Sequence, residues 1–449
     1  MMTLAQVATW TGGTLLGGDC LLNGVSTDTR TLQPGELFVA LRGERFDGHS
    51  MLAAARAAGA RAVLVEQEQT EFEHAVWVSD SRQGLGRLAA GWAAQFAPPT
   101  VAVTGNAGKT TVKEMIACML GDDTLATQGN LNNDIGVPLT LLRMGPRHRA
   151  AVIELGASGP GEIAWTSALV RPQVALITNV TGAHLAGFGS MDGIAAAKAE
   201  IFSGMAAGGH AVINLDDGYA DRFSRAAQDA SLHCSTVSVS DTAADFYASD
   251  VNVDEHGVAF VLHHQGDALP VQLPLQGAHQ VSNALMAAAA VVALDRPLAA
   301  ALARLRQLAP VPGRVQRQRC LGGTLIDDSY NANPGSVRAA MALLMQCPAP
   351  RALVLGAIGE LGEQSDALHR ALGEDARALG IDQCIAVHPG ARPVAAGFGG
   401  TAVATDQHQQ AADLAAAVLR DGGSVLVKGS RSARMDVVTA LLQGMGETR

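Results

Sequence analysis

The segment VAVTGNAGKTT, residues 101–111, constrains this chain more than any other stretch. A β-branched strand runs into a glycine turn, and a helix follows. The backbone N–H groups of such a turn point into a concavity and the helix N-terminus adds positive potential, so the turn suits a phosphate group. The common phosphate-binding loop has four residues between its glycines, whereas only two separate Gly105 from Gly108. The segment therefore predicts a nucleotide site of a less common type; the alternative is a glycine-rich turn beside a surface lysine.

Apolar strands alternate with helical segments along the chain. AAVIELG, VALITNV and HAVINLDD follow the loop, and after a Pro/Gly-rich boundary at 309–314 the pattern restarts with GTLIDDSY, RALVLGA, IDQCIAV and GSVLVKGS. This alternation predicts mainly parallel sheets covered by helices on both faces. The segment 281–308 is expected to be one helical stretch, and the helix after the loop has an apolar face made of Val112, Met115, Ile116 and Met119.

The length of 449 residues is too great for one core, because a domain takes roughly 150 residues. We expect three α/β domains. They are a small N-terminal domain (1–80), a central domain with a P-loop-type parallel sheet (81–312) and a Rossmann-like C-terminal domain (313–449).

Composition excludes several classes of protein. The formal net charge of −10 argues against a surface that coats nucleic acid. The longest apolar run, ALMAAAAVVAL at 284–294, is too short to span a bilayer. The first residues lack the basic and apolar segments of a secretory leader. Six cysteines without a C-x-x-C pair indicate a reduced, cytoplasmic protein.

Polar residues stand where the predicted strands of the central domain end. Glu154 closes AVIELG and His184 follows ITNVTGA. Ligands gather at the carboxyl ends of parallel strands, and a carboxylate there can hold a metal ion. The alternatives are an ordinary strand-end carboxylate and a loop histidine. Lys198, in AAAKAEIF, is on spacing alone a solvated helix lysine.

Two further polar segments follow strands of the C-terminal domain. IDDSYNANPGS (326–336) contains adjacent carboxylates at Asp327 and Asp328, which repel one another unless a cation lies near. VLVKGSRSARMD places Lys428 and Arg431 after a strand, where arginine can bind a carboxylate through two hydrogen bonds. The alternatives are a well-formed turn and a basic helix start exposed to water.

These stretches, in this order, resemble the Mur ligase superfamily, the ATP-dependent enzymes that form amide bonds in bacterial peptidoglycan synthesis. TGNAGKTT is similar to that family's short T-G-x-x-G-K-[ST] loop. DDSYNANP, GNLNNDIGVPLTLL (129–142) and the pair STDTR and LFVALRGERFDGHS are similar to the branch that joins D-Ala-D-Ala to UDP-MurNAc-tripeptide. The resemblance spans residues 26–436. The alternative is the branch that adds a single amino acid to UDP-MurNAc-dipeptide.

The resemblance implies a monomer that uses ATP and Mg²⁺ and forms an acyl-phosphate intermediate. It implies that the first domain binds the UDP-substrate, that the second binds ATP and that the third is the ligase domain. The implied catalytic residues are Lys109, Lys198, His184 and Glu154, with Thr110, Glu154 and His184 as metal ligands. Lys198 matches a lysine that several family members carry as a carbamate. The implied ATP contacts are Thr104, Gly105, Asn106, Ala107, Gly108, Lys109, Thr110, Thr111, Asn283, Arg314, Asp328 and Asn331. The implied substrate contacts are Ser26, Asp28, Arg30, Arg42, Gly43, Asn130, Asn133, Lys428, Ser430 and Arg431.

The chain departs from the family pattern in three places. Ala357 stands where the family usually has Asp, Gln280 replaces an Asn, and Ser158-Gly159 replaces a frequent Asn-His pair. These departures bear on the details of nucleotide and substrate contacts. A rival of another class is a P-loop GTPase or a regulatory ATP-binding module, but the sequence contains no N-K-x-D guanine signature.

Overall fold

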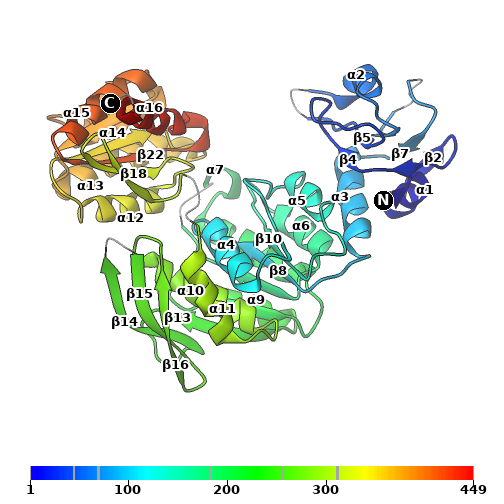
Figure 1. Ribbon diagram of the computed structural model, residues 1–449, viewed down its shortest axis with the longest axis horizontal. Coiled ribbons are helices and arrows are strands. Elements are labelled where there is room, and N and C mark those ends of the chain that lie inside the picture. Colours follow the sequence, from blue (N-terminus) through cyan, green and yellow to red (C-terminus); the bar gives the residue numbers. More distant parts are fainter. Residues whose placement is uncertain are drawn as a thin grey trace.

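The computed structural model describes residues 2–43, 46–67, 71–181, 185–254, 257–309 and 313–447. It contains three α/β units, each built on its own main sheet. The N-terminal unit (blue) and the C-terminal unit (yellow to red) adjoin different sides of the central unit (Figure 1). None of the described helices has the length and apolar character needed to cross a membrane.

The N-terminal unit has a five-stranded sheet in the order β2-β7-β6-β5-β4, and β1 and β3 form a separate ribbon. All neighbours in the larger sheet are parallel except β2 and β7. Helix α3 packs against α1 of this unit and against α5 and α6 of the central unit, so it joins the two. The elements are β1 (Met2–Thr3), α1 (Leu4–Thr11), β2 (Thr14–Leu16), β3 (Leu21–Leu22), β4 (Val25–Ser26), β5 (Leu37–Val39), α2 (Leu52–Ala57), β6 (Ala62–Val65), β7 (Ala75–Trp77) and α3 (Ser81–Ala93).

The central unit has a nine-stranded sheet in the order β16-β15-β14-β13-β12-β11-β8-β10-β9. Strands β8 to β14 pair in parallel, as the sequence predicts, whereas β14, β15 and β16 form an antiparallel extension that was not expected. The strands are β8 (Thr100–Thr104), β9 (Thr124–Ala126), β10 (Ala150–Glu154), β11 (Val174–Ile177), β12 (His210–Asn214), β13 (His233–Ser238), β14 (Phe246–Asp254), β15 (Gly257–His264) and β16 (Asp267–Leu273). The helices are α4 (Lys109–Leu120), α5 (Gly136–Leu141), α6 (Glu162–Val170), α7 (Leu185–Phe188), α8 (Met191–Ala199), α9 (Ala220–Asp229), α10 (His279–Val292) and α11 (Leu298–Arg304).

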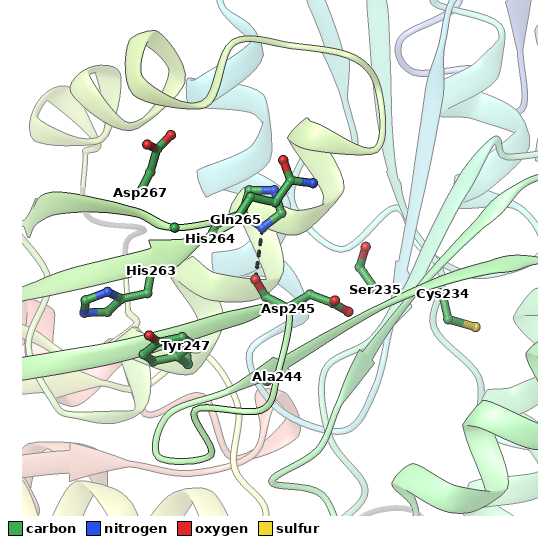
Figure 2. A pocket seen from close by; sticks show the side chains of 10 residues that line it. Cys234, Ser235, Ala244, Asp245, Tyr247, His263, His264, Gln265 and Asp267 are labelled. Carbon is green, nitrogen blue, oxygen red and sulfur yellow. Dashed lines mark hydrogen bonds between the residues drawn. The ribbon is translucent and has the colours of Figure 1, made fainter.

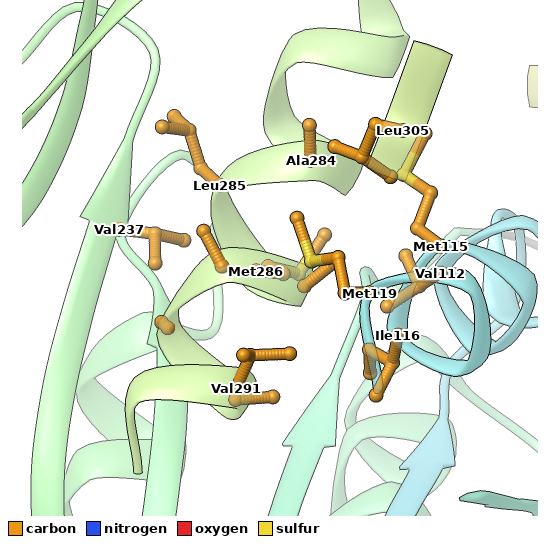
Figure 3. Packing of buried hydrophobic residues seen from close by; sticks show 14 of the residues in the cluster. Val112, Met115, Ile116, Met119, Val237, Ala284, Leu285, Met286, Val291 and Leu305 are labelled. Atoms are coloured by element: carbon orange, nitrogen blue, oxygen red, sulfur yellow. The ribbon is translucent and has the colours of Figure 1, made fainter. Parts of the chain in front are cut away.

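Helices α4 and α10 cover one face of this sheet and pack against each other (Figure 3). The predicted apolar face of α4 is buried at all four positions, and it meets Ala284, Met286 and Leu305 in the same core cluster. The helical stretch expected over 281–308 is divided into two α-helices: α10 ends at Val292 and α11 begins at Leu298. Pro297 lies between them, and proline can neither continue an α-helix nor allow its predecessor an easy helical conformation.

The C-terminal unit has a six-stranded sheet in the order β17-β18-β22-β19-β20-β21. Only β17 runs antiparallel to its neighbour, so the sheet is doubly wound as expected. The elements are β17 (Gln316–Cys320), β18 (Gly323–Asp328), α12 (Pro334–Leu344), β19 (Arg351–Gly356), α13 (Ser365–Ala378), β20 (Gln383–Val387), α14 (Arg392–Phe398), β21 (Val403–Thr405), α15 (His408–Arg420), β22 (Ser424–Lys428) and α16 (Asp436–Glu447).

Candidate active site

The glycine turn lies between β8, which ends at Thr104, and α4, which begins at Lys109. Both glycines have positive φ, +138° at Gly105 and +81° at Gly108, a region that other residues avoid. A Cβ added to Gly105 would lie 2.0 Å from Thr178 Oγ1. The turn is thus a tightly packed loop at the carboxyl end of β8, an inner strand between β11 and β10, and the carboxyl ends of strands are where parallel sheets bind ligands.

Strand β11 holds this loop from the side. The Thr178 hydroxyl donates to the carbonyl oxygen of Ala107 (2.6 Å), and Asn179 Oδ1 accepts from the Ala107 N–H (2.9 Å). The Asn106 N–H donates to the carbonyl oxygen of Asn179 (3.0 Å). These supporting residues were missed from the sequence, where ITNV was taken only as the end of a strand.

The Lys109 ammonium lies on the loop itself. Its Nζ donates to the carbonyl oxygens of Gly105 (2.7 Å) and Asn106 (3.3 Å). Desolvation lowers the pKa of Lys109 most, Glu154 opposes this effect, and Arg314 adds to it. A cation is therefore held where a phosphate bound in the loop would need one.

Thr110 and Glu154 form a buried pair of oxygen donors beside the loop. The Thr110 hydroxyl donates to Glu154 Oε2 (2.7 Å), and Asn132 Nδ2 donates to Oε1 (2.7 Å). The Glu154 N–H donates to Thr127 Oγ1 (2.9 Å). A hydroxyl and a carboxylate suit Mg²⁺, which prefers oxygen ligands and completes its shell with water and substrate phosphates. Asn132 and Thr127 were also missed, although strand-end geometry and the GNLNND segment pointed to this region.

The metal-ligand expectation for His184 falls outside the described residues. Within the described part of the chain, no three His, Cys, Asp or Glu side chains are grouped so that they could hold a metal ion by themselves. The pair of Thr110 and Glu154 therefore fits a metal that also binds the phosphates of a nucleotide, and does not fit an independent protein-only metal site.

Lys198 on α8 is buried, with 1% of its surface exposed, rather than solvated. Its pKa is lowered to about 7, most by burial and next by Lys109, while Glu162 and Glu200 oppose the shift. Its Nζ lies 5.5 Å from the centre of the Phe188 ring. Close to neutral pH a substantial fraction of this amine is therefore uncharged, which the spacing of the sequence did not reveal.

The polar segments of the C-terminal unit meet at the ends of β18 and β22. Asp328 and Lys428 are paired in register on these neighbouring strands, and Lys428 Nζ donates to Asp328 Oδ2 (2.5 Å). Lys428 also donates to the carbonyl oxygen of Asn331 (3.0 Å) and is only 2% exposed. Lys428 is thus the cation that the adjacent carboxylates of Asp327 and Asp328 need. Burial raises the pKa of Asp327. Lys428 is occupied by this ion pair, whereas the neighbouring Arg431 is exposed.

Tyr330 lies between two arginines. The Arg314 guanidinium carbon is 4.4 Å from the ring centre and that of Arg431 is 5.2 Å away. Arg314 Nε is buried and has no hydrogen-bond partner among the described residues. Tyr330, which was not among the predicted site residues, therefore brings together Arg314, a predicted ATP contact, and Arg431, a predicted dipeptide contact.

The C-terminal unit faces the loop of the central unit. Arg314 influences the pKa of Lys109. The pKa of His279, at the start of α10, is lowered first by desolvation, and is then raised by Asp328 and lowered by Lys428. The two units also approach each other at Gly335, where an added Cβ would lie 3.7 Å from Thr181. The polar strand ends of both sheets thus contribute to one site.

Asn283 of α10 reaches the loop from the same side. A Cβ added to Gly108 would lie 2.8 Å from Asn283 Oδ1. Asn283 Nδ2 donates to Gln280 Oε1 (2.9 Å). Gln280, one of the three departures from the family pattern, therefore holds the side chain of Asn283, which is predicted to contact the nucleotide. The departures at Ala357 and Ser158 lie elsewhere: Ala357 accepts a backbone hydrogen bond from Ser430 (3.1 Å), and the Ser158 hydroxyl donates to Glu162 (3.1 Å).

The residues expected to bind the UDP moiety lie in the N-terminal unit. Ser26 Oγ donates to the carbonyl oxygen of Asp28 (3.0 Å), and hydrogen bonds from Arg30 lower the pKa of Asp28 to about 2. Arg42, next to Gly43, forms ion pairs with Asp47 (3.1 Å) and Glu66 (3.7 Å). The N-terminal unit that carries these groups lies apart from the C-terminal unit, on another side of the central unit (Figure 1). Asn130 and Asn133, the other substrate candidates, are exposed in the segment between β9 and α5.

A surface cavity of about 320 Å³ lies on strands β13 to β15, away from these residues (Figure 2). Tyr247 and His263 stack there with ring centres 4.5 Å apart, and His264 Nδ1 donates to the carbonyl oxygen of Asp245 (2.9 Å). None of the residues predicted from the sequence lines this cavity. The candidate site is therefore the cluster between the central and C-terminal units.

A phosphate loop at the end of a parallel sheet, an acidic strand end beside it and a second α/β unit facing it define an ATP-dependent enzyme of the P-loop class. Three family models match the chain: Mur ligase family, catalytic domain (21–93), Mur ligase middle domain (103–291) and Mur ligase, glutamate ligase domain (313–431). The chain belongs to the Mur ligase family. The resemblance and the fold class expected from the sequence are thereby confirmed.

Individual relatives are similar over the whole length. The UDP-N-acetylmuramoyl-tripeptide–D-alanyl-D-alanine ligase of Escherichia coli K12 is 44% identical over 457 residues, covering 99% of both chains. The ligase of the same name from Bacillus subtilis is 34% identical and covers 83% of this chain and 82% of its own. Among solved structures, MurF from Acinetobacter baumannii matches with a TM-score of 0.91 at 34% identity, covering 98% of both chains. MurF from Thermotoga maritima in complex with ADP matches with a TM-score of 0.83 at 27% identity, covering 95% and 98%.

Proposed function

We propose that this chain joins D-alanyl-D-alanine to UDP-N-acetylmuramoyl-tripeptide at the expense of ATP. The products are UDP-N-acetylmuramoyl-pentapeptide, ADP and phosphate, in peptidoglycan precursor synthesis. The observation that carries this proposal is the full-length likeness to ligases of that activity, 44% identity over 99% of both chains for the Escherichia coli enzyme. The P-loop cluster supports it, because it supplies what phosphoryl transfer needs.

The reaction divides into two steps. An oxygen of the terminal carboxylate of the tripeptide attacks the γ-phosphorus of ATP, the bond to ADP breaks, and an acyl phosphate forms. The amine of D-alanyl-D-alanine then attacks the acyl carbon, the carbon–oxygen bond to phosphate breaks, and a proton leaves the nitrogen. Each step depends mainly on positioning and on neutralising charge, since phosphoryl transfer needs little covalent help from a protein.

The residues of the central unit have corresponding tasks. The loop around Gly105 and Gly108 binds the phosphates with its N–H groups, and Lys109 balances their charge. Thr110 and Glu154 would hold Mg²⁺, which would neutralise phosphate charge when it is bound. The 2.7 Å contact between these two side chains supports a shared metal position.

Lys198 carries a proposal of its own. With its pKa at about 7, the amine is available in its neutral form at the pH of the cell. A neutral amine adds to CO₂: a nitrogen–carbon bond forms, a proton leaves, and a carbamate results. We propose that Lys198 acts as this carbamate, whose negative charge is balanced by the nearby Lys109 and by a metal ion.

The remaining substrates are assigned to the flanking units. The UDP moiety is proposed to bind the N-terminal unit at the patch around Ser26 and Arg42, and the dipeptide to bind near Arg431. The domain roles are UDP-substrate binding for 1–80, ATP binding for 81–312 and ligation for 313–449. The proposed setting is the cytoplasm, where ATP and nucleotide-linked precursors are available, with the enzyme acting as a monomer.

The test is phosphate release from ATP and Mg²⁺ in four mixtures. One contains UDP-MurNAc-tripeptide with D-alanyl-D-alanine, two omit one of these substrates, and one offers UDP-MurNAc-dipeptide with diaminopimelate or lysine. The proposal expects release only in the complete first mixture. Release only with the shorter substrate would assign the chain to the branch that adds a single amino acid, and ATP binding without release in any mixture would point to a regulatory nucleotide-binding module.

A further inference from the structure

Lys113 is a buried lysine on α4, one turn beyond Thr110, and it has no part in the reaction described above. Only 1% of its surface is exposed. A buried ammonium costs several kcal/mol unless it is paired and hydrogen-bonded. Helix α4 otherwise turns apolar side chains toward the core at Val112 and Ile116. A lysine at this position therefore needs an explanation beyond packing.

The ammonium of Lys113 has two partners in the described chain. It forms an ion pair with Glu114, whose side chain reaches solvent, and it donates to the carbonyl oxygen of Thr127 (2.7 Å). Thr127 follows directly after the edge strand β9, whose last registered pair with β10 is Ala126 with Val152, and the Thr127 N–H donates to the carbonyl oxygen of Val152 (3.2 Å). Lys113 thus ties the end of an edge strand to the phosphate-loop helix.

Thr127 connects this bond to Glu154. The Thr127 side chain, 1% exposed, accepts a hydrogen bond from the Glu154 N–H (2.9 Å). The segment that continues from Thr127 carries Asn132, whose amide holds the Glu154 carboxylate (2.7 Å). One of the two contacts that fix Glu154 from this side is therefore made by the residue that Lys113 binds, and the other by Asn132, five positions later in the same segment.

We propose that Lys113 is a positioning residue for Glu154: it fixes the end of β9 so that Thr127 and Asn132 hold the Glu154 carboxylate against Thr110. This inference rests on the proposed function in so far as Glu154 serves a metal ion. The alternative is that Lys113 only stabilises the fold. The two differ in one respect, because a merely structural lysine would affect unfolding without changing the affinity of folded protein for a divalent cation.

The test measures cation affinity directly. Binding of Mn²⁺ to the protein–ADP complex is followed by electron paramagnetic resonance of the free ion, with no tripeptide or dipeptide present. For Lys113→Met, which keeps an unbranched side chain one atom shorter and removes its charge, we expect folded protein with Mn²⁺ affinity lowered on the order of tenfold. The affinity for ADP without metal should stay within about twofold of the unchanged chain.

Two further variants complete the design. Ile116→Ala opens a cavity on the same helix without touching Thr127, so it should lower the melting temperature and leave Mn²⁺ affinity unchanged. Thr127→Val removes the hydroxyl that holds Glu154, so it should weaken Mn²⁺ binding as Lys113→Met does, and it decides the question if Lys113→Met does not fold.

Folded Lys113→Met with unaltered Mn²⁺ affinity would overturn the proposal, and so would an equal loss in Ile116→Ala. If Lys113→Met does not fold, unaltered Mn²⁺ affinity in Thr127→Val would overturn it. The Mn²⁺ assay contains neither the tripeptide nor the dipeptide substrate. A failure of the proposed function would therefore appear only in the phosphate-release assay, and the Mn²⁺ affinities could still be compared among the variants.

Discussion

At the scale of single residues, burial changes what Lys198 can do. Its pKa is lowered from the ordinary 10.5 to about 7, first by desolvation and then by Lys109. Between these two values the unfolded chain binds a proton that the folded chain does not, so folding stability rises with pH across this window. That stability is lost progressively as the pH falls from 10.5 to about 7, and below about 7 both states hold the proton.

The first prediction concerns carbon dioxide. In buffer with bicarbonate, the ligase rate should rise with pH through about 7 as the Lys198 amine loses its proton. In buffer stripped of CO₂ the rate should fall several-fold at the same pH. Lys198→Met should be slow in both buffers and insensitive to the change. A wild-type rate that does not respond to CO₂ would show that Lys198 acts as an amine or only as a structural residue.

At the scale of elements, the phosphate loop depends on the absence of a side chain at Gly105. Its φ of +138° and the 2.0 Å approach of an added Cβ to Thr178 Oγ1 are both incompatible with alanine. Gly145 offers a matched control, because it lacks a positive φ and an added Cβ there meets nothing within 4 Å. The two glycines thus separate local strain from the general effect of adding a methyl group.

We predict that Gly105→Ala destabilises the chain by about 2 kcal/mol and weakens ADP binding at least tenfold, since backbone strain of this kind costs roughly 1–3 kcal/mol. Gly145→Ala should alter neither quantity appreciably. Isothermal calorimetry with ADP and thermal unfolding supply the measurements. Normal ADP affinity in Gly105→Ala would mean that the loop can shift away from Thr178 and that its packing is less constrained than described.

The loop after β19 depends on one buried histidine of α13. His369 Nε2 accepts from the Ile358 N–H (2.9 Å), and Nδ1 donates to the carbonyl oxygen of Ser365 (2.8 Å), so the bonded form is neutral. Burial lowers its pKa, while Ser365 and Asp366 oppose the shift. The same loop receives Ser430, whose Oγ accepts from the Gly359 N–H (2.8 Å).

The sign of the pH effect follows from the lowered pKa. Below about 6.5 the unfolded chain binds a proton that folded His369 excludes, so stability falls as the pH falls through this range. We predict that the melting temperature of His369→Gln declines less than that of the unchanged chain between pH 7 and pH 5.5. Parallel declines would show that other groups govern acid stability.

The elements also show how far sequence reasoning reaches. Local signals sufficed for the glycine turn, for the buried face of α4 and for Glu154 at a strand end. Pro297 carried a local signal of the break between α10 and α11 that was passed over. The bonds of Thr178 and Asn179 to Ala107 could not be read from the sequence, because they depend on β8 and β11 lying side by side although 71 and 72 positions separate the partners.

The antiparallel extension illustrates a second limit. Strands β14, β15 and β16 are joined by hairpins and extend one edge of the parallel sheet. The local sequence does not indicate to which edge of a sheet a hairpin is added. Lys113 is a third case, because a lysine in a helix is usually solvated and only the packing of β9 against α4 buries it. The missing information is in each case long-range contact.

At the scale of the whole molecule, the tasks are divided among units. The residues expected to bind the UDP moiety lie in the N-terminal unit, whereas α4, which begins at Lys109, lies in the central unit (Figure 1). Arg314 lowers the pKa of Lys109 across the boundary between the central and C-terminal units. Substrate binding and phosphoryl transfer should therefore respond separately to substitution.

Lys109→Ala tests this separation. Phosphate release should fall by on the order of 10²–10³-fold or more, as for other electrostatic groups that act on the transition state. The affinity for UDP-MurNAc-tripeptide, measured by calorimetry without ATP, should remain within about twofold. Equal loss of both properties would mean that the variant is misfolded or that the units are not independent, and the assignment of Lys109 would then fail.

The central claim is that ATP activates the tripeptide carboxylate for attack by the dipeptide amine, and an isotope measurement tests it most directly. UDP-MurNAc-tripeptide labelled with ¹⁸O at both oxygens of its terminal carboxylate is incubated with ATP, Mg²⁺ and D-alanyl-D-alanine, and the phosphate and pentapeptide are analysed by mass spectrometry. The account predicts one ¹⁸O in each phosphate released and one retained in the new amide. Unlabelled phosphate, with or without pentapeptide, would contradict it, because the carboxylate oxygen would then never have been bonded to phosphorus.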